Sequence, residues 1–331
     1  MNYDKLWYIK LKEQAKTDFK MFKKINKNKF YSIADKYMKD KKHVKFVIKD
    51  NKLKIEYDDE IWSRIESAEK FINGLLTYVI KNNLDSIDGE YIMRLGDSCD
   101  LNSKIPIFTY SKPKNIKGFL FPDFNLNLLD EKKITFQNKC SNVIKKDIIY
   151  FKGNPTSRKK TKIREKLEPF TNDILKVDLQ KTDYRPYYEI CNYKYVLDLP
   201  GNFPWSVRLI ELYLSKSLPF RVNFYYVDSY KEKNYKYDQW IQFYESMFPE
   251  DISYINFKYE NSFYTEITDE KTEKIKNDLI NKFHYFESNP DLYNKIVNEN
   301  YKKSNALTFE HIYYYLYEIF SYYKKLTNQQ D

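Results

Sequence analysis

Residues 193–227 read YKYVLDLPGNFPWSVRLIELYLSKSLPFRVNFYYV, and this stretch decides the fold. The apolar run over 193–199 is typical of a buried strand, and the segment from 205 to 217 has the apolar spacing of a helix. A second strand-like run follows over 219–227. Strand, helix and strand in this order form the repeating unit of a parallel sheet, so the stretch predicts an α/β fold.

The same alternation continues on both sides of this stretch. Strands are predicted over 147–153, 173–179 and 251–257, and helices over 157–170, over 237–248 and over most of the chain up to residue 325. Alternation over such a length predicts a parallel sheet covered by helices. Ligands of open parallel sheets bind beyond the carboxyl ends of the strands, where loops lead into helices.

The N-terminal part has strands and helices of its own. The pattern predicts helix over 4–40, a hairpin over 43–57, a long amphipathic helix over 58–83, short strands over 91–95, 105–111 and 117–122, and a helix over 135–146. A chain of 331 residues is too long for one ordinary core. We therefore expect two α/β domains, residues 1–143 and 144–331, with a ligand site in the crevice between them.

Composition excludes several classes of protein. Apolar residues make up 42% of the chain and aromatic residues 18%, so the chain is not disordered. The 6 glycines form neither a GxGxxG nor a P-loop motif, which argues against a dinucleotide dehydrogenase or a P-loop NTPase. The 3 histidines stand apart without an HExxH motif, so no metal site is expected. The net charge of +10 reflects Lys enrichment typical of an AT-rich genome, and is weak support for a polyanionic partner.

Cysteine usage and hydropathy indicate the compartment. Cys99, Cys140 and Cys191 are widely spaced and form no CxxC motif, which predicts neither a disulfide framework nor a zinc site. No segment approaches the ~20 continuous apolar residues of a membrane span, and the first residues lack the apolar core of a signal peptide. We therefore expect a cytoplasmic protein, or one in the host cytoplasm if the source is a large DNA virus.

Two strand ends carry residues that suit an anion. The first is followed by Gly201 and Asn202, where a ligand can approach the backbone closely, and then by Trp205, Ser206 and Arg208 at the start of a helix. A helix N-terminus offers unpaired N–H groups, Ser206 adds a donor, and an arginine can bind two phosphate oxygens at once. Such a site suits a phosphate or diphosphate, although Ser206 could equally be a simple helix cap with Arg208 in solvent.

The second strand end repeats this chemistry. Its candidate ligand-binding residues are Lys152, Gly153, Thr156, Ser157 and Arg158. Two neighbouring strand ends equipped for anions favour a nucleotide diphosphate. The alternative is that the Lys- and Arg-rich segment 158–166 faces solvent or contacts nucleic acid; for its lysines we favour solvent.

Three blocks of sequence together resemble glycosyltransferase family 90, which includes protein O-glucosyltransferases, capsule xylosyltransferases and lipopolysaccharide-modifying enzymes. The blocks are PIFTYSK at 106–112 followed by Pro122, FKGNPTS at 151–157, and CNYKY at 191–195 followed by Gly201, Ser206 and Arg208. They keep the family's order and approximate spacing over residues 92–325, about two thirds of the chain.

The resemblance implies a GT-B-like fold, in which two Rossmann-type domains face each other across a cleft and the C-terminal helices pack back on the N-terminal domain. It also implies an inverting, metal-independent transfer of a sugar, glucose or xylose, from a UDP-sugar to a hydroxyl of a glycan or protein, without a cofactor. By position, Asp97 matches the family's catalytic base, with Asp100 as a rival, and Arg208 matches a residue that holds the diphosphate. The acceptor-side residues would be Ser111, Lys112, Asp123 and Phe124.

The chain also departs from the family pattern. Pro155 stands where the protein O-glucosyltransferases have an arginine, so Lys152 or Arg158 would have to replace that arginine at the diphosphate. Two alternatives to a glycosyltransferase stay open: a catalytically silent relative that binds a nucleotide-sugar, and a basic α/β protein that binds nucleic acid.

Overall fold

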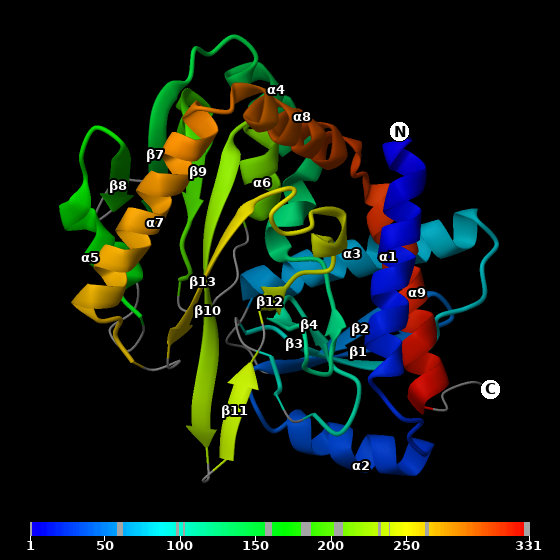
Figure 1. Ribbon diagram of the computed structural model, residues 1–331. Coiled ribbons are helices and arrows are strands. Elements are labelled where there is room, and N and C mark those ends of the chain that lie inside the picture. Colours follow the sequence, from blue (N-terminus) through cyan, green and yellow to red (C-terminus); the bar gives the residue numbers. More distant parts are fainter. Residues whose placement is uncertain are drawn as a thin grey trace. The chain divides into compact units, whose positions relative to one another are not determined.

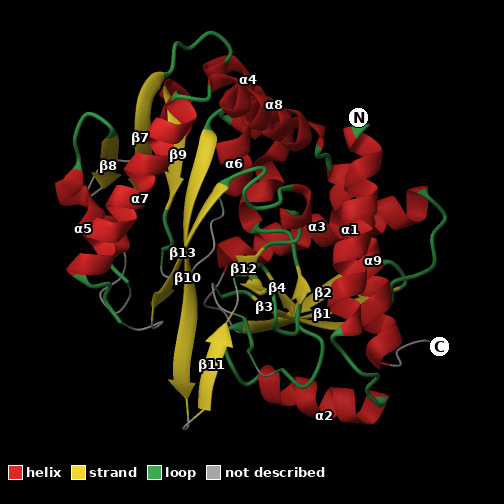
Figure 2. Cartoon of the chain, viewed as in Figure 1, coloured by secondary structure: helices red, strands yellow, loops and turns green. Residues whose placement is uncertain are grey.

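The protein is described by a computed structural model that covers residues 2–57, 62–96, 99–101, 103–155, 161–179, 187–201, 208–230, 233–237, 239–261 and 265–327. The fold is mixed α/β, as the sequence predicts (Figures 1 and 2). The chain divides into two compact units. The first comprises Met1–Leu129, Trp240–Met247 and Leu307–Asp331, and the second comprises Asp130–Gln239 and Phe248–Ala306.

We expected two domains that follow each other along the chain, residues 1–143 and 144–331, whereas each observed unit combines separate segments of the chain. The first unit ends its N-terminal segment at Leu129 and takes in two later segments of the chain. One of them carries α9 (Phe309–Thr327), whereas α7 (Asp269–Glu287) and α8 (Pro290–Ala306) belong to the second unit.

The first unit is built on a mixed five-stranded sheet with the order β2-β1-β3-β4-β6. Its strands are β1 (His43–Lys49), β2 (Lys52–Glu56), β3 (Gly89–Arg94), β4 (Phe108–Thr109) and β6 (Phe119–Leu120). The predicted hairpin over 43–57 is confirmed, with Asp50 and Asn51 at the turn. Both have positive φ, 50° and 57°, as a two-residue turn between right-twisted strands requires.

Helices complete the core of the first unit. They are α1 (Tyr3–Lys20), α2 (Lys27–Tyr37), α3 (Trp62–Lys81), the short η1 (Phe124–Leu128) and α9. In Figure 1, α9 (red) runs alongside α1 (blue), and the two are in contact. The fully buried Tyr323 of α9 accepts a hydrogen bond from the Ile92 N–H in β3, and Tyr315 donates one to the Leu120 carbonyl in β6. The C-terminal helix is therefore part of this unit's core.

The predicted helix over 237–248 is wrong. The segment contains the short strand β12 (Trp240–Ile241), which pairs with β5 (Lys112–Pro113), and the single turn η4 (Glu245–Met247). Its aromatic residues have helical spacing, yet they lie buried in an irregular segment. Phe243, for example, stacks on Tyr315 with 5.0 Å between the ring centres. The spacing of apolar residues alone does not distinguish a helix from a buried irregular segment.

The second unit is built on a sheet whose parallel strands have the order β8-β7-β9-β10-β13. These strands are β7 (Lys146–Gly153), β8 (Leu175–Leu179), β9 (Tyr193–Asp198), β10 (Leu218–Tyr230) and β13 (Ile255–Asn261); β11 (Lys233–Tyr237) pairs antiparallel with the far end of β10. In chain order this is 2-1-3-4-5, the order of a doubly wound sheet. The direction of winding reverses between β7 and β9, and ligands of such sheets bind at that switch point.

Besides α7 and α8, the second unit has α4 (Leu129–Cys140), α5 (Ile163–Leu167), η2 (Glu168–Phe170), η3 (Tyr187–Asn192) and α6 (Leu209–Leu214). Helix α4 begins and ends six residues before the range predicted for it, and α5 and α6 are shorter than predicted. Helix α7 lies over the sheet in Figure 1. Its Phe283 packs on Tyr195 of β9, and its Phe286 packs on Phe220 of β10.

The expectation of no disulfide is wrong. Cys140, at the end of α4, is bonded to Cys191 in η3, with a Cα–Cα distance of 5.0 Å. The two cysteines are 51 residues apart, and a pairing over that distance leaves no pattern in the sequence. Cys99 is a buried free thiol.

Candidate functional site

The predicted anion-binding residues that are described gather at the switch point of the second unit. Strand β7 ends at Gly153 and β9 at Asp198, and the two run parallel with Tyr150 opposite Val196. Both strands therefore present their carboxyl ends at the same edge of the sheet. Gly201 follows β9, and Arg208 immediately precedes α6.

Arg208 lies across the end of β7. Its guanidinium donates a hydrogen bond to the Lys152 carbonyl. It also lies over two aromatic rings, 5.4 Å from the centre of Phe151 and 5.0 Å from that of Tyr187. The carbonyl and the rings fix the position of the guanidinium while leaving it with the full charge of a cation.

A second arginine, Arg164 of α5, approaches the same phenyl ring. Its guanidinium lies 5.1 Å from the centre of the Phe151 ring, and it donates hydrogen bonds to the carbonyls of Asn154 (2.8 Å) and Leu199 (2.9 Å). It therefore ties the loop after β7 to the loop after β9. Sequence reasoning missed Arg164, because it stands in a Lys-rich segment that predicts a solvated helix face.

The two guanidiniums raise the positive potential of this edge. Burial, and then the positive charge of Arg208, lower the pKa of Arg164 to about 10. The buried Nε of Arg164 has no hydrogen-bond partner among the described residues. Two guanidiniums with an unused donor on Arg164 are suited to an anion with several acceptor oxygens.

The glycines of the two loops make room for these arginines. A Cβ at Gly153 would lie 2.8 Å from the Phe151 ring and 3.3 Å from an Arg208 nitrogen. A Cβ at Gly201 would lie 3.1 Å from an Arg164 nitrogen. We expected Gly201 to let a ligand approach the backbone; in the structure, the side chain of Arg164 takes that space.

The side chain of Lys152 has a different partner from the one expected. It is buried, and its ammonium group lies 2.6 Å from the carboxylate of Glu189 in η3. Together with the stacking of Tyr187 on Arg208, this ion pair holds η3 against the end of β7. Lys152 thus supports the site through its carbonyl and through Glu189.

Several predicted site residues lie outside the described part of the chain. They are Thr156, Ser157 and Arg158 after β7, Asn202, Trp205 and Ser206 before α6, and the predicted base Asp97.

The rival base, Asp100, belongs to the first unit. Its carboxylate is 2.8 Å from both His43 Nε2 and an Arg94 guanidinium nitrogen. Two side chains of the first unit therefore hold this carboxylate in place, and the choice between Asp97 and Asp100 as the base stays a prediction. The neighbouring Cys99 thiol has its pKa raised to about 12 by burial and then by Asp100.

The four predicted acceptor-side residues also lie in the first unit, and they make internal contacts there. Lys112 is 1% exposed, 3.0 Å from the carboxylate of the buried Asp18. Ser111 is also 1% exposed. Asp123 caps η1 by accepting a hydrogen bond from the Asn125 N–H, and Phe124 lies 5.0 Å beneath the Arg64 guanidinium. A role for these residues in acceptor binding stays a prediction.

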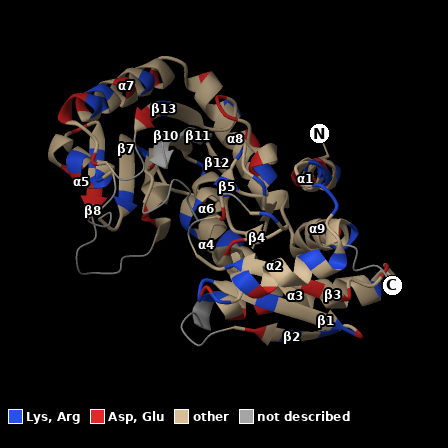
Figure 3. Cartoon of the chain, turned by 90° about the horizontal axis from the view of Figure 1, so that it is seen from below, with Lys and Arg blue, Asp and Glu red and all other residues tan. Residues whose placement is uncertain are grey.

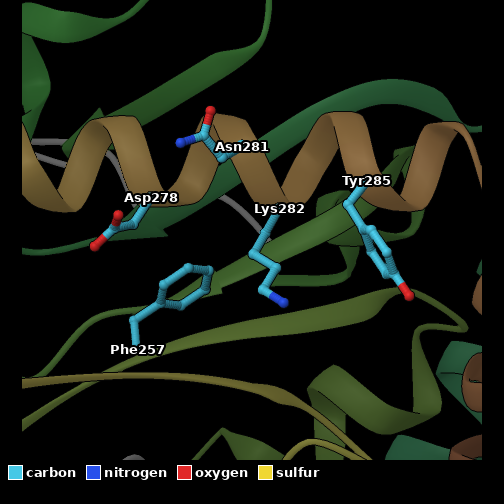
Figure 4. A pocket seen from close by; sticks show the side chains of 5 residues that line it. All are labelled: Phe257, Asp278, Asn281, Lys282 and Tyr285. Carbon is cyan, nitrogen blue, oxygen red and sulfur yellow. The ribbon is translucent and has the colours of Figure 1, made fainter.

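A pocket of 370 Å³ lies elsewhere in the second unit, between α7 and β13 (Figure 4). It is lined by Phe257, Asp278, Asn281, Lys282 and Tyr285. It contains none of the predicted site residues, and its lining has one carboxylate, Asp278, and one amino group, Lys282. Asp278 already accepts a hydrogen bond from the Tyr259 hydroxyl at 2.7 Å. We therefore place the candidate site at the switch point.

Comparison with known proteins gives no match: neither a protein-family model nor a curated protein sequence matches the chain. Among the described helices, none has the length and hydropathy to cross a membrane. Within the described ranges, no group of three or more His, Cys, Asp or Glu side chains could hold a metal ion.

Proposed function

We propose that the protein is an inverting, metal-independent glycosyltransferase that uses a UDP-sugar, with glucose or xylose as the sugar. The observation that carries this proposal is the convergence of Arg164 and Arg208 on Phe151 at the switch point. A diphosphate is the nucleotide group that such a pair of guanidiniums binds best. The sequence blocks shared with glycosyltransferase family 90 supply the reaction.

The chemistry divides into two tasks. A base, Asp97, removes the proton from the acceptor hydroxyl as that oxygen attacks the anomeric carbon, and the bond from that carbon to the diphosphate breaks. Arg208 and Arg164 stabilise the negative charge that develops on the departing diphosphate. Two fixed guanidiniums thereby supply the charge that a divalent metal supplies in other enzymes. The GT-B-like arrangement of two domains around a cleft, with the base on one side and the diphosphate on the other, is part of the proposal.

The nucleic-acid alternative has less support from the charges. Lys162 lies 2.6 Å from Glu266, and Lys166 lies 2.6 Å from Asp269 at the start of α7. Figure 3 shows both signs of charge interspersed along α7. Two lysines of the basic segment are therefore neutralised locally, and we propose no nucleic-acid partner. The proposed acceptor is a hydroxyl of a glycan or protein. The proposed compartment is the cytoplasm; the Cys140–Cys191 disulfide removes one of the grounds for it, the cysteine usage.

Replacing the base tests the proposed reaction. A general base contributes about 10²–10⁴-fold, so Asp97→Asn should reduce UDP release from UDP-glucose or UDP-xylose, in the presence of an acceptor, by about that factor. UDP binding should be retained, because Asn keeps the shape of the side chain. Asp100→Asn is the matched control. Full activity of Asp97→Asn would refute Asp97 as the base, and a wild-type protein that binds UDP without turnover would be the silent relative.

A further inference from the structure

A buried carboxylate interacts electrostatically with Arg164. Asp198, the last residue of β9, is 4% exposed. Its Oδ2 lies 3.3 Å from Nε of Arg221, which is its neighbour across the sheet in β10. Its Oδ1 is also buried and has no hydrogen-bond partner among the described residues.

Such an oxygen needs a donor. Leaving a buried acceptor unsatisfied costs about 1–3 kcal/mol, and more for a charged group. Arg221 does not supply this donor, because its Nε contacts the other oxygen, Oδ2, and its guanidinium lies over the Tyr254 ring, 5.4 Å from the centre. Arg221 instead fixes the orientation of the carboxylate from one side and leaves the second oxygen for another partner.

The position of Asp198 ties this oxygen to the anion site. The residue that follows it, Leu199, accepts a hydrogen bond from Arg164 through its carbonyl. The negative charge of Asp198 acts on Arg164, partly offsetting the effect of burial on the arginine's pKa. The same sheet edge therefore has an unused donor, Arg164 Nε, and an unused acceptor, Asp198 Oδ1.

Arg164 Nε needs an acceptor from a ligand, whereas Asp198 Oδ1 needs a donor. A phosphate oxygen can satisfy the arginine, but it would be repelled by the carboxylate. Only a hydroxyl or N–H donor can satisfy Asp198. The backbone of DNA lacks such a donor, and inorganic phosphate and diphosphate have one only in their protonated forms, whereas a sugar attached to a phosphate has several hydroxyls.

We propose that Asp198 accepts a hydrogen bond from a sugar hydroxyl of the bound ligand, and so selects phosphate esters of sugars over bare phosphates. The hydroxyl comes either from the ribose of the nucleotide or from the transferred sugar. This inference rests on the proposed function, because it assumes that Arg164 and Arg208 hold the phosphates.

A ligand series on the unmodified protein tests the inference by calorimetry in EDTA. The series compares UDP with 2′,3′-dideoxy-UDP, with inorganic diphosphate, and with UDP-glucose. If the ribose supplies the hydroxyl, dideoxy-UDP should bind about tenfold or more weakly than UDP, the loss expected for a hydrogen bond to a charged group. If the transferred sugar supplies it, UDP-glucose should bind tighter than UDP by about that factor.

Variants separate this inference from the proposed function. Two affinity ratios matter here, that of UDP to dideoxy-UDP and that of UDP-glucose to UDP. Asp198→Asn should reduce whichever of the two is large, whereas Asp178→Asn should preserve it. Asp178 is an aspartate near the end of β8, which β7 separates from β9, and it accepts a hydrogen bond from Tyr150. Suppose that the wild type binds UDP, but binds dideoxy-UDP as tightly as UDP, and UDP-glucose no tighter than UDP. The role of Asp198 is then refuted, while the proposed anion site is retained. If neither UDP nor diphosphate binds, the proposed function fails and the inference fails with it.

Discussion

At the scale of single residues, the account rests on two guanidiniums that share one phenyl ring. After burial, the positive charge of Arg208 is the second cause that lowers the pKa of Arg164, yet backbone carbonyls of the two strand ends hold both arginines in place. A bound anion would offset their repulsion and raise the pKa of Arg164 again. The site is therefore prepared for negative charge before a ligand arrives, as electrostatic catalysis requires.

The first prediction concerns Arg208. Arg208→Ala should weaken UDP binding by about 1.5–3 kcal/mol, the range for hydrogen bonds to charged groups. Arg208→Lys should restore only part of the lost UDP affinity, because an ammonium group lacks the planar guanidinium that hydrogen-bonds two phosphate oxygens at once. Calorimetric titration with UDP measures both effects.

A matched control for this variant is Lys194→Ala, which removes a cation near the opposite end of β9. It should leave UDP affinity unchanged. Equal UDP affinity of wild type and a folded Arg208→Ala protein would show that Arg208 only stabilises the loops around β7.

The sequence predicted one of the two arginines. Arg208 was found because a serine and a glycine precede it at the end of a strand. Arg164 lies 11 positions after Gly153 in a segment of lysines. In the structure it belongs to the short helix α5, which follows Lys162 in the left-handed conformation with φ of 52°. Nothing in the local sequence pattern predicts that the Arg164 side chain contacts the two strand ends while neighbouring lysines pair with other groups.

At the scale of elements, η3 connects the disulfide to the anion site. Cys191 near its end is bonded to Cys140 of α4, while Tyr187 and Glu189 at its start contact Arg208 and Lys152. The ammonium group of Lys145 adds to this anchoring by donating hydrogen bonds to the carbonyls of Cys191 (2.6 Å) and Ser215 (2.9 Å). The disulfide and the lysine together hold the element that supports the two site residues.

Reduction of this disulfide should destabilise the protein. A cross-link between residues 51 apart contributes about 4 kcal/mol in the chain-entropy model, by restricting the unfolded chain. Urea unfolding of the second unit, with and without dithiothreitol, should therefore show a lower midpoint under reduction. Cys140→Ser should reproduce the loss and abolish the effect of dithiothreitol, whereas Cys99→Ser should leave that effect unchanged. Alkylation of Cys140 in the unreduced native protein would refute the pairing.

The elements also show where sequence patterns succeed. Long amphipathic helices such as α3 and α7, the hairpin of β1 and β2, and the parallel strands of the second unit were predicted because each has a period or a turn of its own. The segment 237–248 was predicted as a helix because its aromatic residues recur at helical spacing. Burial of those residues comes from packing within the first unit, including Phe243 on Tyr315, and local spacing cannot reveal such a partner.

At the scale of the whole molecule, the chain forms two α/β units. The alternation of strands and helices predicted the parallel sheet of the second unit, and the order of its strands follows only from the structure. That order identifies the edge between β7 and β9 as the switch point and so locates the candidate site. The return of α9 to the first unit could not be derived from periodicity, because it depends on the buried contacts of Tyr315 and Tyr323.

The central claim is that this edge binds the diphosphate of a UDP-sugar through fixed positive charge without a metal. The most direct measurement is calorimetric titration of the wild-type protein with UDP in EDTA, repeated with manganese. The account predicts one site with the same affinity in both conditions, and a rise of about 2.7 kcal/mol in the free energy of unfolding at 100 times the dissociation constant. Binding that appears with manganese and vanishes in EDTA would contradict the account.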